Sequence, residues 1–216
     1  MIVLGLDPSL TQYGWALHDT SATVGDPGRC PARGRFRTPS KMEFIDRYMT
    51  QRKRLRALIR ETKPDKVGIE FPIFNDLWSE GMYGLFLFSC EALKTEKCDV
   101  VFWTPNQVKA HARETVVRPP GWAMDKSDMV EAAKVDASGG QWNHNEADAY
   151  LVARLSARFW EFRAEKLPEV ELTSKEAQFF AKVHTFVRGK RAGKTVRTGM
   201  VYREDERFFA WGTRPE

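Results

Sequence analysis

Residues 1–19, MIVLGLDPSLTQYGWALHD, decide how the rest of the chain is arranged. The apolar, partly β-branched run 2–6 predicts a buried strand, Pro8 and Ser9 predict a turn, and residues 13–17 predict a second, antiparallel strand. Asp7 therefore stands at the tip of a buried strand, above a hairpin. Its carboxylate either serves function or only shapes the turn, since Asp-Pro is common in turns. Other carboxylates at the same place would favour function.

Length and composition indicate how many domains the chain has, what kind of partner it binds and in which compartment it works. The 216 residues suit one main domain with room for an appendage, and the net charge of +5 favours a polyanionic partner. Three cysteines without CxxC spacing indicate a reducing compartment and no zinc site. We expect neither a signal peptide nor a membrane-spanning segment, and hence a cytoplasmic protein.

The next segments predict a sheet covered by helices. Residues 34–38 suit a third strand, and residues 44–59 suit an amphipathic helix, capped by Ser40 with Glu43, whose other face is basic. Residues 66–71 predict another buried strand that carries Glu70 near its end. Because a strand–helix–strand order brings equivalent strand ends to one edge of a sheet, we expect Asp7 and Glu70 to lie side by side.

The second half of the chain supplies a third carboxylate. Residues 75–97 predict a long helix that is apolar on more than one face, so it is deeply buried or shared with a partner. A strand at 99–103 and helices at 106–113 and 125–137 follow. In the next helix Asp148 lies between two alanines, on the same side as Asn145 and His144, and we expect it to face the sheet.

These residues together predict a metal site. Asp7, Glu70 and Asp148, with Asn145 or His144 beside the last, would form an oxygen-rich cluster that suits Mg²⁺, with Mn²⁺ as a substitute. Two such ions can activate water and stabilise the leaving oxygen of a phosphodiester.

The motifs that carry these residues resemble the RuvC-like Holliday junction resolvases of the ribonuclease-H-like superfamily. The resemblance covers about residues 1–160 and rests on GLDPS (5–9), GWA (14–16), IE (69–70), PNQVK (105–109), KS (126–127) and EADA (146–149). It implies an α/β fold with a mixed five-stranded sheet flanked by helices, over residues 1–165. Residues 166–216 would form a small C-terminal extension. The function implied is metal-dependent cleavage of four-way junctions and other branched DNA, in DNA recombination and repair.

The resemblance also assigns roles to residues. It makes Asp7, Glu70 and Asp148 metal ligands and places Lys109 and Lys126 near the scissile phosphate. Asn145 stands where the family has a fourth acidic ligand, sometimes a histidine, so either Asn145 or His144 would complete the site.

Further expectations concern the site, the DNA contacts, the assembly and the source of the chain. An aspartate at position 145 would keep or raise activity. Phe71 and Phe74 would lie where the family places an aromatic residue against junction bases, with Arg118 as a further DNA contact. The helix at 75–97 would build a homodimer. Extended chains of this kind look like versions from bacteriophages, which act inside the infected host cell.

The C-terminal extension has a composition of its own. Its basic loop contains Arg188, Lys190, Arg191, Lys194 and Arg197, near short aromatic strands at 200–202 and 207–211. Such a loop can hold nucleic-acid backbone, or it can be the solvated tip of a hairpin.

Two other functions stay open. The first is a branched-DNA-binding protein on the same fold with little or no catalysis. Asp7, Glu70 and Asp148 argue against it, but Asn145 leaves it open. The second is an actin-like or sugar-kinase-type ATPase, which also opens with a strand, an aspartate and a glycine turn. That class needs a second phosphate loop and a longer chain, and the sequence shows neither.

Overall fold

The computed structural model describes residues 1–71, 80–119, 121–164 and 166–180, and three short strands between 183 and 202. In chain order its elements are β1 (Ile2–Asp7), β2 (Gln12–Asp19), η1 (Pro27–Arg29), β3 (Arg33–Arg37), α1 (Phe44–Thr62), β4 (Lys66–Glu70), α2 (Glu80–Thr95), β5 (Val100–Trp103), α3 (Pro105–Ala112), α4 (Lys126–Asp136), α5 (His144–Arg163), η2 (Glu169–Glu171), α6 (Ser174–Phe180), β6 (Val183–Thr185), β7 (Thr195–Arg197) and β8 (Met200–Tyr202). None of the helices described is long and apolar enough to cross a membrane.

The main sheet is mixed and has the strand order β3-β2-β1-β4-β5-β8. Strands β1, β4 and β5 run parallel, whereas β2, β3 and β8 pair antiparallel with their neighbours. The five predicted strands are therefore present. The sixth, β8, comes from the C-terminal extension and was predicted as a strand but not as part of this sheet.

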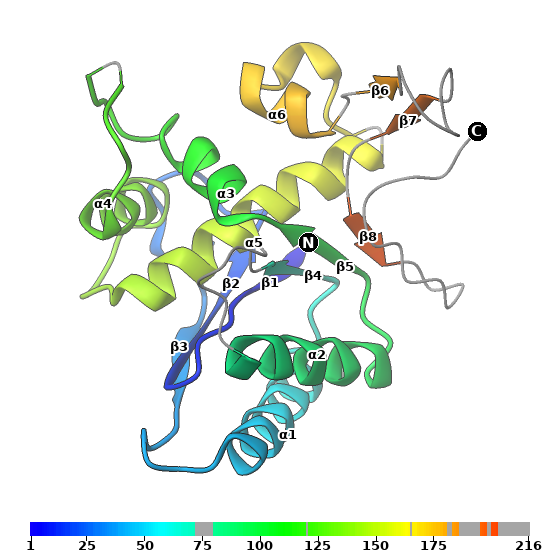
Figure 1. Cartoon of the computed structure of the whole chain (residues 1–216). Helices are drawn as coiled ribbons and strands as arrows, with labels where there is room; N and C mark the ends of the chain where they lie inside the picture. Colours follow the sequence, from blue (N-terminus) through cyan, green and yellow to red (C-terminus); the bar gives the residue numbers. More distant parts are fainter. Residues whose placement is uncertain are drawn as a thin grey trace.

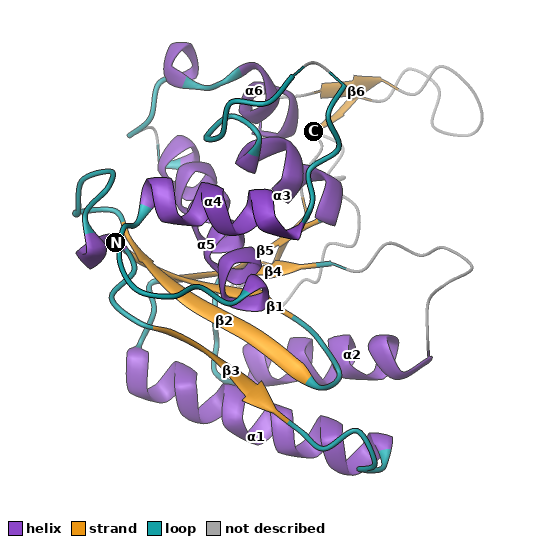
Figure 2. Ribbon diagram, turned by 90° about the vertical axis from the view of Figure 1, so that its left-hand side faces the viewer, coloured by secondary structure: helices purple, strands orange, loops and turns teal. Residues whose placement is uncertain are grey.

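Helices cover both faces of the sheet. Helices α1 and α2 lie on one face, and α5 lies on the other with α3, α4 and α6 around it (Figures 1 and 2). The central strands bury side chains on both faces: Leu4, Leu6 and Ile69 pack toward α1 and α2, while Val101 and Trp103 pack toward α3 and α5. Continuous apolar runs in the sequence are typical of strands that helices cover on both faces of the sheet.

Helix α5 lies in direct backbone contact with the sheet. A Cβ atom at Gly5 would come within 1.9 Å of the Ala149 carbonyl oxygen, and one at Gly14 within 2.1 Å of the Asn145 carbonyl oxygen. Side chains at these two strand positions would push the helix away. The glycines thus hold the first two turns of α5 over the ends of β1 and β2.

The start of the C-terminal extension belongs to the same core. Phe180 of α6 is 5 % exposed and packs against Trp103 and Phe159. Glu176 accepts two hydrogen bonds from Arg158 of α5, at 2.9 and 2.8 Å. Over the described residues, α6 therefore completes the apolar layer above β5. The division of the chain between 165 and 166 stays a prediction.

The start of α1 also differs from the prediction. Glu43, rather than Ser40, is the N-cap residue, and it makes no side-chain cap hydrogen bond. Arg47 holds the preceding turn instead: one guanidinium nitrogen donates to the carbonyl oxygens of Pro39, Ser40 and Met42. A buried arginine on the helix thus replaces the expected capping box.

Candidate active site

Two of the predicted carboxylates lie at neighbouring strand ends. The parallel register pairs Leu6 of β1 with Ile69 of β4, so Asp7 and Glu70 occupy the next, adjacent positions. Both side chains are half-buried. Glu70 in turn pairs with Trp103 of β5. The expectation that the two acids stand side by side is confirmed, and it follows from the parallel strand order.

Asp148 of α5 joins them from the helical layer. Burial raises the pKa of Asp7 well above its ordinary value, and the charges of Glu70 and Asp148 raise it further. Burial, followed by the charge of Asp148, raises the pKa of Glu70 to about 8. Burial also raises the pKa of Asp148 to about 6. We call these three groups the carboxylate trio. The charges of Glu70 and Asp148 destabilise ionised Asp7, and the charge of Asp148 destabilises ionised Glu70, a pattern typical of functional sites.

The two predicted lysines face the trio. Lys126 lowers the pKa values of Asp7 and Asp148, and Lys109 lowers those of Glu70 and Asp148. Both side chains are exposed, and neither makes a salt bridge within the described residues. Lys126 begins α4, where a cation opposes the helix dipole. Its position beside two carboxylates explains why a lysine is placed there.

The carboxylate oxygens of the trio are ligands that suit a hard divalent cation, although their side chains are not arranged as a complete metal site. Across residues 1–71 and the described segments from 80 to 180, no three His, Cys, Asp or Glu side chains are gathered so that they could hold a metal ion. Three half-buried carboxylates with raised pKa values repel each other, and a divalent cation would relieve that repulsion. The ligand assignments therefore stay predictions that the donor types support.

Asn145 has a structural contact that the sequence did not predict. Its side-chain nitrogen Nδ2 donates to the Gln12 carbonyl oxygen of β2 at 2.7 Å, and the residue is 8 % exposed. The amide therefore fastens the first turn of α5 to the hairpin. Because Nδ2 is committed, Oδ1 is the only side-chain atom of Asn145 that could bind a cation.

His144 is the first residue of α5 and is half-buried. Burial, followed by the charges of Lys126 and Arg35, lowers its pKa, which favours the neutral imidazole that metals bind. Glu146 faces another way, as expected from its place on the helix. It lies 3.7 Å from Arg33 and 3.6 Å from Arg35 of β3. Sequence reasoning missed this link, although the alternate arginines of an edge strand share one face.

Phe71, which was predicted to contact DNA, lies in an apolar layer of the fold. Phe71 is 9 % exposed and packs edge-on against Phe86 of α2, with ring centroids 5.0 Å apart, and against Phe102 of β5, at 6.5 Å. It follows β4 directly into the apolar layer beneath α2, and contact between Phe71 and DNA stays a prediction. Phe74 lies outside the described residues.

The other predicted DNA contacts fall into two groups. The guanidinium of Arg118 donates to Asp128 at 2.7 Å and also pairs with Glu131, so it braces a loop within the protein. Contact between Arg118 and DNA stays a prediction. Arg188, Lys190, Arg191 and Lys194 lie outside the described residues, and Arg197 is described only as part of strand β7.

Comparisons with known proteins agree with this geometry. No protein-family model matches the chain. A curated relative from Halothermothrix orenii, named crossover junction endodeoxyribonuclease RuvC, is 33 % identical over 75 residues. That match spans 35 % of this chain and 44 % of the relative, so it covers less than half of the relative's length.

Solved structures extend the likeness to most of the chain. Thermus thermophilus RuvC in complex with a Holliday junction substrate has a TM-score of 0.59 at 15 % identity, over 77 % of this chain and 97 % of that one. A second T. thermophilus RuvC structure gives 0.59 at 17 % identity, over 77 % and 98 %. The fold of this chain is the fold of RuvC. Its sheet carries Asp7 and Glu70 at neighbouring strand ends, and Asp148 comes from α5.

Proposed function

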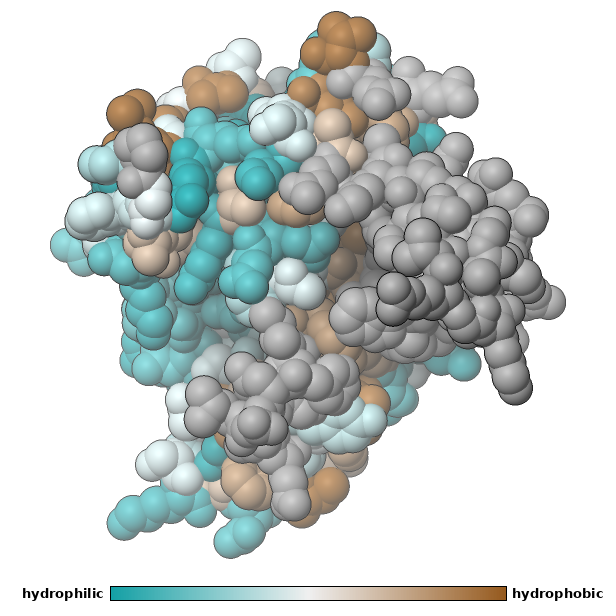
Figure 3. All heavy atoms as spheres, turned by 45° about the horizontal axis from the view of Figure 1, so that its top comes forward, coloured by the Kyte–Doolittle hydropathy of each residue, from teal (hydrophilic) through white to brown (hydrophobic). Residues whose placement is uncertain are grey.

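We propose that this chain is a metal-dependent endonuclease that cleaves phosphodiester bonds in four-way junctions and other branched DNA. The observation that carries the proposal is the carboxylate trio with Lys109 and Lys126 beside it, on a RuvC-like sheet. A protein of the same fold is bound to a Holliday junction in its solved structure. On the face drawn in Figure 3, hydrophilic residues form a broad area beside the residues drawn in grey.

Asp7, Glu70 and Asp148 would hold Mg²⁺ or Mn²⁺, with two ions in each site and either Asn145 Oδ1 or His144 as a further ligand. Divalent ions in such sites activate water and stabilise the leaving oxygen of a phosphodiester. The carboxylates are held by two strand ends and by a helix in backbone contact with the sheet, which limits their freedom.

The lysines would bind the DNA backbone at the same place. Lys109 and Lys126 already offset part of the negative charge of the trio, since each lowers the pKa of two of its members. A phosphodiester bound by their ammonium groups would lie close to the carboxylates. The two lysine charges would reduce the repulsion between the phosphate and the trio. Most affinity for DNA would come from such phosphate contacts, so binding and cleavage should be separable.

A nuclease assay with labelled four-way junctions tests this function. With Mg²⁺ the parent protein should cleave the junction and leave a linear duplex of the same sequence intact, and EDTA should stop cleavage. Asp7→Asn, Glu70→Gln and Asp148→Asn should each reduce cleavage by at least about a hundredfold, since each removes a metal ligand, while junction binding persists.

A matched control comes from the opposite face of the sheet. Asp46→Asn changes an exposed carboxylate of α1 and should leave cleavage unchanged. Full activity in any trio variant would contradict the assignment. Junction binding without cleavage by the parent, at any divalent ion, would identify the non-catalytic alternative.

Symmetric cleavage of a junction needs two active sites, and a twofold dimer supplies them. The layer formed by α1 and α2 exposes large apolar side chains: Phe44 at 51 %, Ile45 at 57 %, Met49 at 49 % and Leu87 at 46 %. A monomer has no use for so many exposed apolar groups on two adjacent helices. This layer is therefore the proposed dimer surface.

Light scattering tests the dimer. Leu87→Glu should yield a folded monomer at micromolar concentration, because Leu87 is exposed, whereas Met82 and Phe88 pack partly against the core and their substitution would also disturb folding. Val24→Glu changes an apolar residue elsewhere that is more exposed, at 67 %, and should leave the dimer intact. A monomeric parent protein would exclude this assembly.

A further inference from the structure

The loop between α3 and α4 holds an exposed tryptophan in a fixed position. Trp122 is 47 % exposed, and its indole Nε1–H donates to Asp128 Oδ2 at 2.9 Å. Its backbone N–H donates to the Pro119 carbonyl oxygen at 3.2 Å, which closes a turn in which Gly121 has a φ of +81°. Its own carbonyl oxygen accepts a hydrogen bond from Arg113. Three contacts thus fix the residue.

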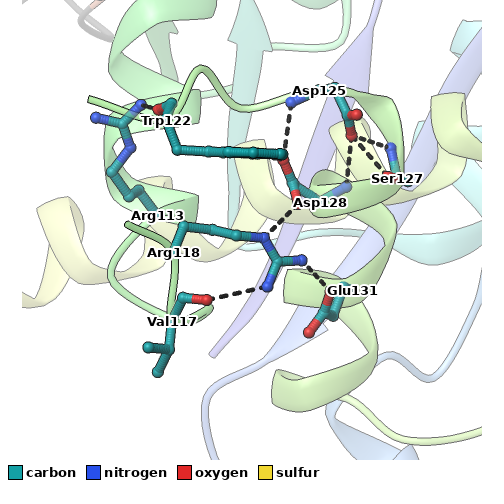
Figure 4. Close-up of polar contacts among 8 residues, drawn as sticks. All are labelled: Arg113, Val117, Arg118, Trp122, Asp125, Ser127, Asp128 and Glu131. Carbon is teal, nitrogen blue, oxygen red and sulfur yellow. Dashed lines mark hydrogen bonds and ion pairs between the residues drawn. The ribbon is translucent and has the colours of Figure 1, made fainter. Parts of the chain in front are cut away.

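Asp128 is the centre of this arrangement. It is 2 % exposed, and its carboxylate accepts from Trp122 on one oxygen and from Arg118 on the other (Figure 4). The Asp125 N–H donates to the same oxygen as the indole, at 3.1 Å. Hydrogen bonds and the nearby Arg118 keep the pKa of Asp128 near 2. The carboxylate therefore stays ionised at neutral pH and holds the indole against the first turn of α4.

The same turn of α4 carries Lys126. Lys126 influences the pKa values of Asp7, Asp148 and His144, so the first turn of α4 borders the carboxylate trio. The acids around the loop are already engaged: Asp125 accepts from Ser127 and from the Asp128 N–H, and Glu131 pairs with Arg118. Lys126 is thus the cation of this turn that remains available to a phosphate.

An exposed indole on the loop that leads into the turn of Lys126 suits a nucleotide. Single exposed apolar residues are common and need no explanation. Here, however, a buried carboxylate and a glycine turn hold the ring in place before any partner arrives, which reduces the entropy lost on binding. Aromatic rings stack on bases of any sequence, whereas a continuous duplex hides its base faces.

We infer that Trp122 is a stacking platform for an exposed base of branched DNA, on the loop that leads into the turn of Lys126. The inference rests on the proposed function and deepens it. It assigns to the α3–α4 loop a role in selecting branch points over continuous duplex, because only a branch or a strand end exposes a base face to the indole.

Binding experiments with Asp148→Asn protein, which should bind without cleaving, test the inference. Adding Trp122→Ala should weaken binding to a four-way junction by at least about fivefold, the lower end of the loss of one stacked base. Binding to linear duplex should change less. Trp122→Phe keeps a ring but loses the hydrogen bond to Asp128, and its affinity should stay within about threefold of the Asp148→Asn reference. Val117→Ala, at a 95 % exposed position of the same loop, should leave affinity unchanged.

Tryptophan fluorescence separates stacking from loop bracing. The junction should quench the emission of the Asp148→Asn protein, and part of that quenching should vanish in Trp122→Phe although affinity is kept. If Trp122→Phe binds as weakly as Trp122→Ala, the indole only braces the loop and the inference is overturned. Equal affinities of Trp122→Ala and the reference also overturn it, without touching the proposed function. Failure of the reference protein to bind any branched DNA overturns both.

Discussion

Two sites that contain buried or half-buried acidic side chains lie beside helix α5, and their charges are compensated in opposite ways. The carboxylate trio gathers Asp7, Glu70 and Asp148 with no salt bridge among the described residues. The second group, the paired cluster, surrounds Asp136 at the end of α4. Arg29 Nε lies 2.9 Å from Asp136 Oδ2, and Arg154 Nε lies 3.2 Å from Asp136 Oδ1.

Hydrogen bonds complete the paired cluster. The Tyr150 hydroxyl donates to Asp136, and its oxygen lies 3.1 Å from His18 Nδ1. Burial alone would raise the pKa of Asp136, yet Arg154, Tyr150 and Arg29 together lower it. Burial, followed by the charge of Arg29, lowers the pKa of His18 to about 3, so the imidazole is neutral. This cluster needs no partner from outside the protein.

The difference shows which acids serve the fold and which serve function. Asp136 is 0 % exposed and matched by two guanidinium groups. The trio is less buried and makes no salt bridge among the described residues. Its pKa values rise mainly through burial, which Lys109 and Lys126 offset only in part. Selection for stability alone would not favour a repulsive cluster at the ends of two rigid strands.

The largest effect that distinguishes the two groups is on stability. Asp136→Asn leaves Arg29 and Arg154 without their anion and should lower the free energy of unfolding by about 3 kcal/mol or more. Asp148→Asn, the matched isosteric change in the trio, removes a repulsion. In EDTA it should leave stability within about 0.5 kcal/mol of the parent or above it. Urea denaturation followed by circular dichroism measures both, and equal losses in the two variants would contradict the distinction.

The pattern of the sequence was sufficient to predict much of the fold. Apolar runs with polar tips located β1, β4 and β5, and their order placed Asp7 beside Glu70 without knowledge of long-range contacts. The sequence could not show that β8 joins the edge of the sheet at β5, because an edge strand has no signature that names its neighbour. Nor could it show that Phe71 turns inward, since an aromatic residue after a strand suits both a core and a binding surface.

Site residues could be predicted where they follow from spacing within one helix or strand. Contacts between elements far apart in the sequence could not. The alanines around Asp148 indicated a helix close to the sheet. The contact that fastens Asn145, however, joins residues separated by 133 positions. Its donor is a side chain and its acceptor a carbonyl oxygen, and every residue supplies such an acceptor. No pattern in the sequence could single out Gln12.

The hydrogen bond from Asn145 to the Gln12 carbonyl oxygen reverses one expectation about the candidate site. Its expected effect on stability is smaller than that of Asp136→Asn. An aspartate at position 145 cannot donate to the Gln12 carbonyl oxygen and would place a negative oxygen against it. Asn145→Asp should therefore cost about 1–3 kcal/mol of stability and lower cleavage instead of restoring it. The measurements are thermal unfolding and junction cleavage in Mg²⁺.

Asn143→Asp is the matched control for this change. Asn143 caps the same helix only as an acceptor, from the Asn145 N–H at 3.1 Å, and aspartate serves equally well at an N-cap. It should leave stability unchanged. If Asn145→Asp proved as stable as the parent and more active, a metal ligand at this position would outweigh the hydrogen bond to β2.

The smallest expected effect is a pH dependence that separates the two groups. The pKa of Glu70 rises from 4.5 to about 8 on folding, mainly through burial. The folded state therefore favours the protonated acid. This contribution to stability is complete below about pH 4.5 and is lost as the pH rises through 8. Asp136 has the opposite sign, since its lowered pKa gives stability that is lost only in acid, below its ordinary value of 3.8.

Between pH 5 and 8 the contribution of Glu70 to stability changes with pH, whereas that of Asp136 stays constant. A comparison of the parent with Glu70→Gln in this range therefore measures the contribution of Glu70 alone. In EDTA the free energy of unfolding of the parent should fall relative to Glu70→Gln across this range, by on the order of 1 kcal/mol because solvent access reduces the full effect. Mg²⁺ should reduce the fall in the parent, since a cation that binds ionised carboxylates stabilises the folded state. Parallel pH profiles for the two proteins would mean that Glu70 is compensated within the protein, as Asp136 is.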